Sequence, residues 1–180
     1  LARHTGARYV VGLAESNLAG LYLECDRLAD AQRCLDEAIV ISERAGRRTG
    51  LPETYGYAAR LRAARGDLPG AERWASQSLE LANELGLPLE RAIALRLLAQ
   101  IHARTGDGPR ALHAIDEAAA SLADLDRYES ARTEAARARI LRLTGDLEQA
   151  AAVRARAHAA LTTLGAQREL AIIDDVTEVR

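Results

Sequence analysis

Residues 64–71 read Ala-Arg-Gly-Asp-Leu-Pro-Gly-Ala, and this stretch recurs along the chain. Residues 104–111 read Arg-Thr-Gly-Asp-Gly-Pro-Arg-Ala, and residues 143–150 read Leu-Thr-Gly-Asp-Leu-Glu-Gln-Ala. A fainter copy, Glu-Cys-Asp-Arg-Leu-Ala-Asp-Ala, occupies residues 24–31. The alanines that end the four copies follow one another at intervals of 40, 40 and 39 residues. A fixed period of this length indicates a repeat architecture built from one supersecondary unit.

Each copy has the residue order of a helix end followed by a helix start. Gly66, Gly106 and Gly145 suit the left-handed residue just past a helix, and the Asp after each can cap the next helix. Pro69 and Pro109 fall in a first turn, where a missing N–H costs nothing. The pattern predicts helices at about residues 7–25, 28–45, 52–65, 68–85, 88–104, 108–124, 127–143, 147–163 and 167–178.

The composition agrees with helices and argues against strands. Hydrophobic residues make up 48% of the 180 residues and aromatic residues only 3%, with no Phe. We therefore expect an all-α solenoid of about four antiparallel helix pairs in one domain over 1–180. The expected repeats span about 6–45, 51–85, 88–124 and 127–164, with a C-terminal capping helix at about 166–178. Because every basic residue is Arg and Met is absent, we expect a piece of a larger bacterial protein.

The repeats carry the residues of a known family. Leu18, Ala19, Tyr22, Ala31, Leu35 and Ala38 stand at the offsets of the tetratricopeptide repeat pattern, and the third repeat matches it equally well. The second and fourth copies are weaker, with Arg62, Arg137 and Arg154 at usual core positions. The chain thus resembles tetratricopeptide repeats over about residues 6–164. Its long period resembles the helical region of large bacterial ATP-dependent regulators of the maltose-activator type. The resemblance implies a right-handed superhelix that binds partners.

The net charge of −2 and the pI of about 6.1 do not favour nucleic acid or a membrane surface as a partner. Neither a secretory leader nor a long apolar run is present, so we expect a cytoplasmic protein. Cys25 and Cys34 form no CxxC pair, and we expect both to be small buried residues.

The motifs of common catalytic sites are missing. The sequence has no GxxxxGK[ST] loop, no HExxH and no GxSxG elbow. We therefore expect neither an enzyme nor a cofactor or metal site. His102 falls at an aromatic core position and is expected to be packed, whereas His113 and His158 are expected on the surface.

Arginines are unevenly distributed between the two helices of a pair. The expected first helices at 52–65, 88–104 and 127–143 hold 11 Arg and four Glu, whereas the second helices at 28–45, 68–85 and 108–124 hold four Arg and ten acids. The resemblance places first helices on the concave surface, and its offsets for concave side chains fall on Arg60, Arg96, Gln100, Arg104, Arg132, Arg139 and Arg142. Two interpretations stay open: a groove that binds carboxylates or phosphates, or a solvated face neutralised by neighbouring acids.

Two functions follow from these patterns. The first is a scaffold module of a regulatory or signalling protein, which binds a protein segment or acidic peptide on its concave face. The alternative is a sensor domain that binds a small anionic effector. Trp74 is expected to fill a gap between repeats. Tyr9, Val10 and Val11 are unprotected at one end, and they are expected to pack against either a missing helix or a second copy in a homodimer through the solenoid ends. The other end is expected to be capped by Ile172, Ile173, Val176 and Val179.

Overall fold

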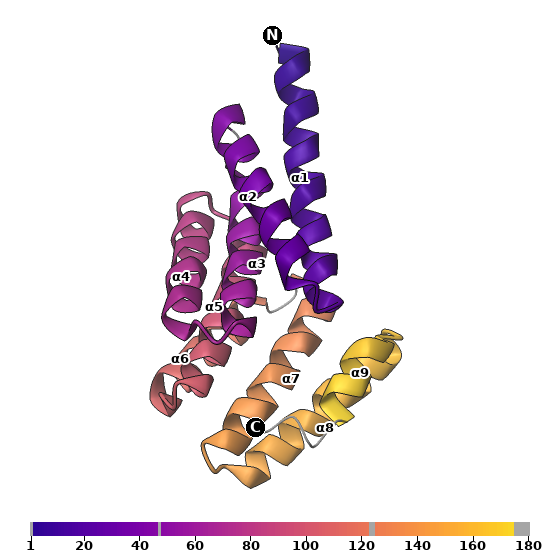
Figure 1. Cartoon of the computed structure of the whole chain (residues 1–180). Helices are drawn as coiled ribbons and strands as arrows, with labels where there is room; N and C mark the ends of the chain where they lie inside the picture. The colour runs from indigo at the N-terminus through magenta and orange to yellow at the C-terminus, as the bar shows by residue number, and fades with distance from the viewer. Residues whose placement is uncertain (1, 47, 123–124, 175–180) are drawn as a thin grey trace. The chain divides into compact units, whose positions relative to one another are not determined.

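The computed structural model describes residues 2–46, 48–122 and 125–174, and these residues form nine helices in sequential antiparallel pairs (Figure 1). The prediction of an all-α, tetratricopeptide-like repeat fold is confirmed. The helices are α1 (Ala2–Glu24), α2 (Leu28–Ala45), α3 (Leu51–Ala64), α4 (Leu68–Glu84), α5 (Pro88–Arg104), α6 (Gly108–Leu122), α7 (Arg127–Leu143), α8 (Leu147–Thr163) and α9 (Gln167–Asp174).

The observed helix bounds follow the predicted ones closely. Helix α1 begins five residues earlier than predicted, and most other bounds agree within one residue. The predicted ends at residues 124 and 178 lie outside the described residues, as do Val176 and Val179 of the expected cap. The right-handed superhelical path stays a prediction.

The repeated Gly-Asp dipeptide builds the turn inside each of three helix pairs. Gly66, Gly106 and Gly145 have φ values of 79°, 82° and 94°, which lie in the left-handed region. The carboxylate of the following Asp accepts a backbone N–H three residues later, as in the 2.9 Å bond from Gly70 N to Asp67 Oδ1. Equivalent bonds reach Asp107 and Asp146. Local capping contacts therefore fix where one helix ends and the next begins in each of these pairs.

Residue contacts divide the chain into two units, residues 1–97 and 98–180. The first unit has a core cluster from α1, α2 and α3: Ala19, Ala31, Cys34, Leu35, Ala58 and Leu61. The second unit has one cluster of Ala99, Ala111, Ala114, Ile115, Ala136 and Ile140, and another of Ala138, Leu141, Ala150 and Val153. The expectation of a single domain over 1–180 stays a prediction.

Several single-residue predictions can be checked against burial. Trp74 is half-buried, packs against the core cluster of the first unit and meets the ring of Tyr55 at 5.2 Å, so it fills space between repeats one and two. His102 is buried at 5% exposure, as expected. Cys34 is also buried, but the prediction for Cys25 is wrong: Cys25 is exposed because it lies in the turn just after α1 ends.

Candidate functional site

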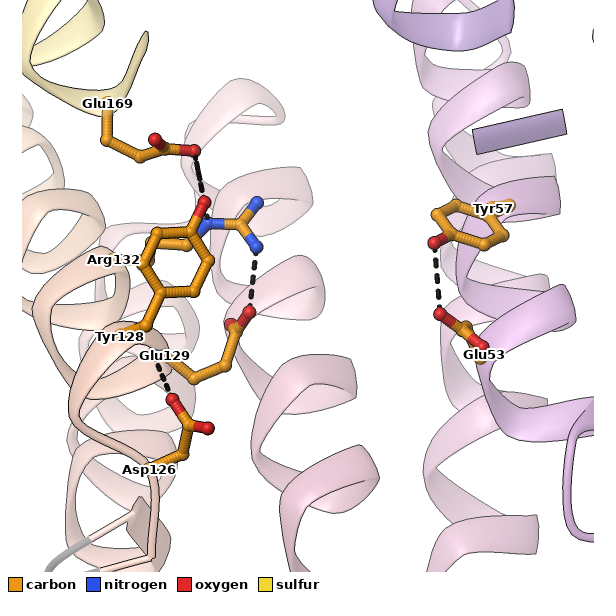
Figure 2. Close-up of polar contacts among 7 residues, drawn as sticks. All are labelled: Glu53, Tyr57, Asp126, Tyr128, Glu129, Arg132 and Glu169. Atoms are coloured by element: carbon orange, nitrogen blue, oxygen red, sulfur yellow. Dashed lines mark hydrogen bonds and ion pairs between the residues drawn. The ribbon is translucent and has the colours of Figure 1, made fainter. Parts of the chain in front are cut away.

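The predicted concave residues of the first unit have little exposed charge. Arg96 is only 7% exposed, so its side chain lies mostly within the helical packing. Arg60 is half-buried, with its guanidinium 5.7 Å from the ring centre of Tyr57. The Tyr57 hydroxyl in turn donates a 3.0 Å hydrogen bond to Glu53 (Figure 2). Burial, and then the charge of Glu53, raises the pKa of Tyr57 to about 12.

Arg132 lies in the second unit and is neutralised by its neighbours. Its guanidinium is 2.8 Å from Glu129 and 3.9 Å from Glu169, and it stacks 5.4 Å from the ring centre of Tyr128. The Tyr128 hydroxyl also donates a 2.6 Å hydrogen bond to Glu169 (Figure 2). Burial by itself would lower the pKa of Arg132, but these acids outweigh it and raise the pKa overall. This cluster attaches α9 to α7, and the interpretation of neutralised arginines describes it well.

Arg139 and Arg142, by contrast, lie together at a cavity. Helices α7, α8 and α9 line a half-open cavity of about 200 Å³, which we call the arginine cavity. Three guanidinium-bearing side chains line it, those of Arg139, Arg142 and Arg154. The remaining lining is apolar: Ala135, Ala138, Leu147, Ala150, Ala151, Ile172 and Ile173.

Helix α9 is fixed at the cavity by Arg154. The Nε atom of Arg154 donates a 3.1 Å hydrogen bond to the carbonyl of Ile173, and its Nη2 is 3.4 Å from Asp174. Asp174 is also 3.6 Å from the ring of His158. Ile173 is 6% exposed, so its side chain is buried where α9 packs on α8. The C-terminal cap stays a prediction: of its described residues, Ile173 is buried, whereas Ile172 is 39% exposed.

The arginine cavity brings three Arg side chains to an apolar floor. Arg142 forms no side-chain hydrogen bond or ion pair with the residues that the structure describes. The nearby acid Glu134 is engaged elsewhere, 3.1 Å from Arg156 and 3.7 Å from Arg137. Among the described residues, the cavity lining includes no Asp or Glu. Such an arrangement suits an anionic group attached to a short aliphatic body, because guanidinium groups bind carboxylate or phosphate as forks.

Sequence reasoning found two of the three cavity arginines and missed Arg154. That residue was noted only as an unusual occupant of a core position. The position of Gly145 could have predicted it. A turn centred on Gly145 sets residue 139 opposite residue 151, and Arg154 lies one helical turn after residue 151. Gln100 and Arg104, also in the second unit, are exposed and do not line the cavity. A binding role for any of the seven predicted residues stays a prediction.

Within residues 2–46, 48–122 and 125–174, no group of three His, Cys, Asp or Glu side chains is arranged to hold a metal ion. Among the same residues, no helix has the length and apolar character needed to cross a membrane.

Residues 11–84 match the family model described as Tetratricopeptide repeat. Residues 11–84 carry tetratricopeptide repeats. No curated protein sequence matches the chain. The matched segment covers helix pairs α1–α2 and α3–α4, so the family assignment rests on the first unit. Tetratricopeptide regions are non-catalytic modules that generally bind other proteins.

Solved structures show the same fold over most of this chain. A signal transduction ATPase with numerous domains and a tetratricopeptide repeat sensor, from Pyrococcus horikoshii, is 17% identical with a TM-score of 0.71. The match covers 92% of this chain and 26% of that one. BtubC from P. vanneervenii is 21% identical with a TM-score of 0.69, covering 84% and 63% of the two chains.

A third similar structure is a putative kinesin light chain with nearly identical tetratricopeptide-like repeats, from Podosopora anserina. It is 19% identical with a TM-score of 0.63, and the match covers 89% of this chain and 83% of that one. At these identities the likeness shows the fold alone. The chain spans about a quarter of the Pyrococcus protein and under two thirds of BtubC.

Proposed function

We propose that this chain is a partner-binding module whose arginine cavity holds an acidic segment of another protein. The observation that carries the proposal is the cavity itself, where Arg139, Arg142 and Arg154 stand around an apolar floor. A carboxylate next to a Leu or Ile side chain matches both parts of this lining. The guanidinium groups bind the carboxylate, and the floor removes aliphatic surface from water at about 25 cal/mol per Å².

The size of the cavity limits what enters it. A volume of about 200 Å³ holds one or two side chains rather than a folded surface. The rest of a partner segment would run along the helices, as repeat architectures with extended surfaces permit. We infer that the module belongs to a bacterial regulatory or signalling protein of the cytoplasm. The use of Arg without any Lys supports a bacterial source, and the likeness to a signal transduction ATPase supports the regulatory or signalling role.

The test uses an array of 12-residue acidic peptides in which Asp or Glu is placed beside Leu, Ile or Ala. We expect the wild-type chain to bind peptides with a Leu or Ile neighbour at least tenfold more tightly than those with Ala. An Arg139→Gln/Arg142→Gln variant is expected to lose this binding. The matched control, Arg110→Gln/Arg127→Gln, removes the same charge from exposed positions of the second unit outside the cavity. Equal binding by both variants would show that the cavity is not the site.

A small anionic effector is the second candidate. The cavity favours it because side chains from three helices line one small space, and the Pyrococcus structure is described as having a tetratricopeptide repeat sensor. Nuclear magnetic resonance titration with aliphatic carboxylates of four to six carbons, and with inorganic phosphate, separates the two candidates. Saturable shifts at Arg142 and Ile172 with a free acid, but no peptide binding, would favour the effector.

A further inference from the structure

Helix α1 has an apolar face that the rest of the first unit leaves uncovered. Its inner side packs on α2 and α3, with Ser16, Ala19 and Gly20 all buried. Its outer side exposes a second set of apolar residues, which we call the α1 outer face: Val10, Val11, Ala14, Leu18 and Leu21. Val10, Val11, Leu18 and Leu21 are 63%, 49%, 40% and 58% exposed.

These residues lie on one arc of the helix. At 100° per residue, positions 10, 11, 14, 18 and 21 fall within about 100°, the width of the stripe by which a helix packs on a core. Asn17 borders the arc, and between residues 10 and 21 the arc holds no charged residue. A helix that is apolar on both sides is suited to burial on both sides.

The internal repeat shows what normally covers this face. The intervals of 40, 40 and 39 residues equate Leu21 with Leu61, Ile101 and Ile140. Those three side chains are each 1% exposed, against 58% for Leu21. Ala14 repeats the pattern: its equivalents Thr54, Ala94 and Thr133 are 2%, 1% and 0% exposed, whereas Ala14 itself is exposed.

The residues that bury two of these equivalents are themselves equivalent. Leu61 of α3 packs in one cluster with Ala31, Cys34 and Leu35 of α2. Ile140 of α7 packs in one cluster with the α6 residues that lie 80 positions further along the chain: Ala111, Ala114 and Ile115. In both cases a second helix presents small residues at i and i+3 and a Leu or Ile at i+4. We call this arrangement the small-small-aliphatic socket.

We propose that the α1 outer face is a docking surface for the second helix of another tetratricopeptide-type pair, which presents a small-small-aliphatic socket to Leu21. This surface is independent of the arginine cavity, since it lies in the first unit. Each socket that buries Leu61 or Ile140 is already filled within this chain. Helix α8 of a second copy would not provide a suitable socket for Leu21, because Arg154 stands at the aliphatic position and already binds α9. The occupant is therefore an additional helix pair rather than a second copy joined head to tail.

The experiment supplies the missing socket by fusion. A duplicate of residues 88–126, which contains the α6 socket, is joined directly to residue 8, the position that the repeat equates with residue 127. The probe is a cysteine placed by Leu21→Cys in a Cys25→Ser background. Its labelling rate is compared in the unfused chain, in the fusion, and in a fusion whose duplicate carries Ala111→Glu and Ile115→Glu. Circular dichroism checks that all three have the expected helicity.

We expect at least tenfold slower labelling in the intact fusion than in the unfused chain, and fast labelling when the socket is blocked. Fast labelling in all three proteins would overturn the proposal. Slow labelling in the unfused chain that speeds up on dilution, with a dimer in sedimentation, would overturn it in favour of a second copy.

A second measurement needs no fusion. In the unfused chain we expect Leu21→Gln to leave the urea midpoint of unfolding unchanged, whereas Leu61→Gln at the equivalent buried position lowers that midpoint strongly. A large loss from Leu21→Gln would mean that the α1 outer face is already covered, which contradicts the proposal.

Discussion

The ring of Tyr57 lies against the backbone of Gly20, so closely that a Cβ at Gly20 would be 2.8 Å from Tyr57 Cζ. Helix α3 can approach α1 at this point because residue 20 has no side chain. The contact joins the first helices of two successive repeats, beside the core cluster of the first unit. Gly20 is therefore required for packing, although its backbone is an ordinary helix.

This contact predicts that Gly20→Ala destabilises the protein. The added methyl meets a packed ring, and overpacking of this kind costs about 1–3 kcal/mol. Gly56→Ala is the matched control, because a Cβ at Gly56 meets nothing within 4 Å and Ala is favoured over Gly inside a helix by about 0.8–1.0 kcal/mol. Urea unfolding followed by circular dichroism measures both variants. If the two substitutions stabilise equally, the close contact between α1 and α3 does not exist in solution.

The turn between α1 and α2 predicts a stabilising substitution. Asp26 has a φ of 55°, the left-handed conformation that glycine adopts at the equivalent position 66. Asp26→Gly removes the strain of a side chain in that region and is expected to gain about 0.5–1 kcal/mol. In the opposite direction, Gly66→Ala is expected to lose about 1 kcal/mol, although a Cβ there meets nothing within 4 Å. Thermal unfolding of both variants measures these changes, and two unchanged midpoints would contradict the assignment of strain.

The helices could be predicted from the sequence because their ends are determined locally. Gly66 and Asp67 terminate one helix and cap the next through bonds that span only a few residues. The same dipeptide recurs, so the error in most helix bounds is a residue or less. The start of α1 was harder to place, since residues 2–6 already belong to the helix but their sequence does not mark its first turn.

The site was less predictable because it depends on tertiary packing. Family offsets place a residue on a helix face but do not say how deeply it is buried, so Arg96 was grouped with Arg139 despite being 7% exposed. Arg132 was counted as a concave charge, but Glu169 of the distant helix α9 helps to neutralise it. Arg154 was missed since its role at the cavity appears only when α9 is in place.

The two cysteines are expected to differ in reactivity. Cys34 is 1% exposed, and burial, followed by its contact with the Glu15 carboxylate, raises its pKa to about 11. Because the thiolate is the reactive form, Cys34 should not react at pH 8 in the folded protein. Cys25 is exposed and should react at once. Titration with a disulfide reagent is expected to give one fast thiol, which Cys25→Ser removes. Two fast thiols in the native wild type would show that α1 and α2 separate readily.

Helix α9 is expected to depend on the hydroxyl of Tyr128. That hydroxyl donates the 2.6 Å bond to Glu169, and Tyr128→Phe removes it while leaving the ring under the Arg132 guanidinium. A hydrogen bond to a charged group contributes about 1.5–3 kcal/mol, and this one should fall near or below the low end because it is exposed. Hydrogen exchange in α9 is expected to accelerate severalfold, with α3 unchanged as an internal control. Unchanged exchange in α9 would mean that Arg154 and Ile173 hold the helix without this bond.

Tyr57 predicts a loss of stability at alkaline pH. Its pKa is raised to about 12 in the folded protein by burial and by Glu53, whereas in the unfolded chain it ionises near its ordinary value of about 10. Below pH 10 both states hold the phenol proton, and the stabilising contribution is complete. As the pH rises from about 10 to 12, the unfolded state loses its proton first, so the free energy of unfolding falls. Urea unfolding at pH 9, 10 and 11 should show this decline, and Tyr57→Phe should make it shallower. If Tyr57→Phe leaves the decline unchanged while absorbance shows all tyrosines ionising together near pH 10, Tyr57 is not buried against α1 in solution.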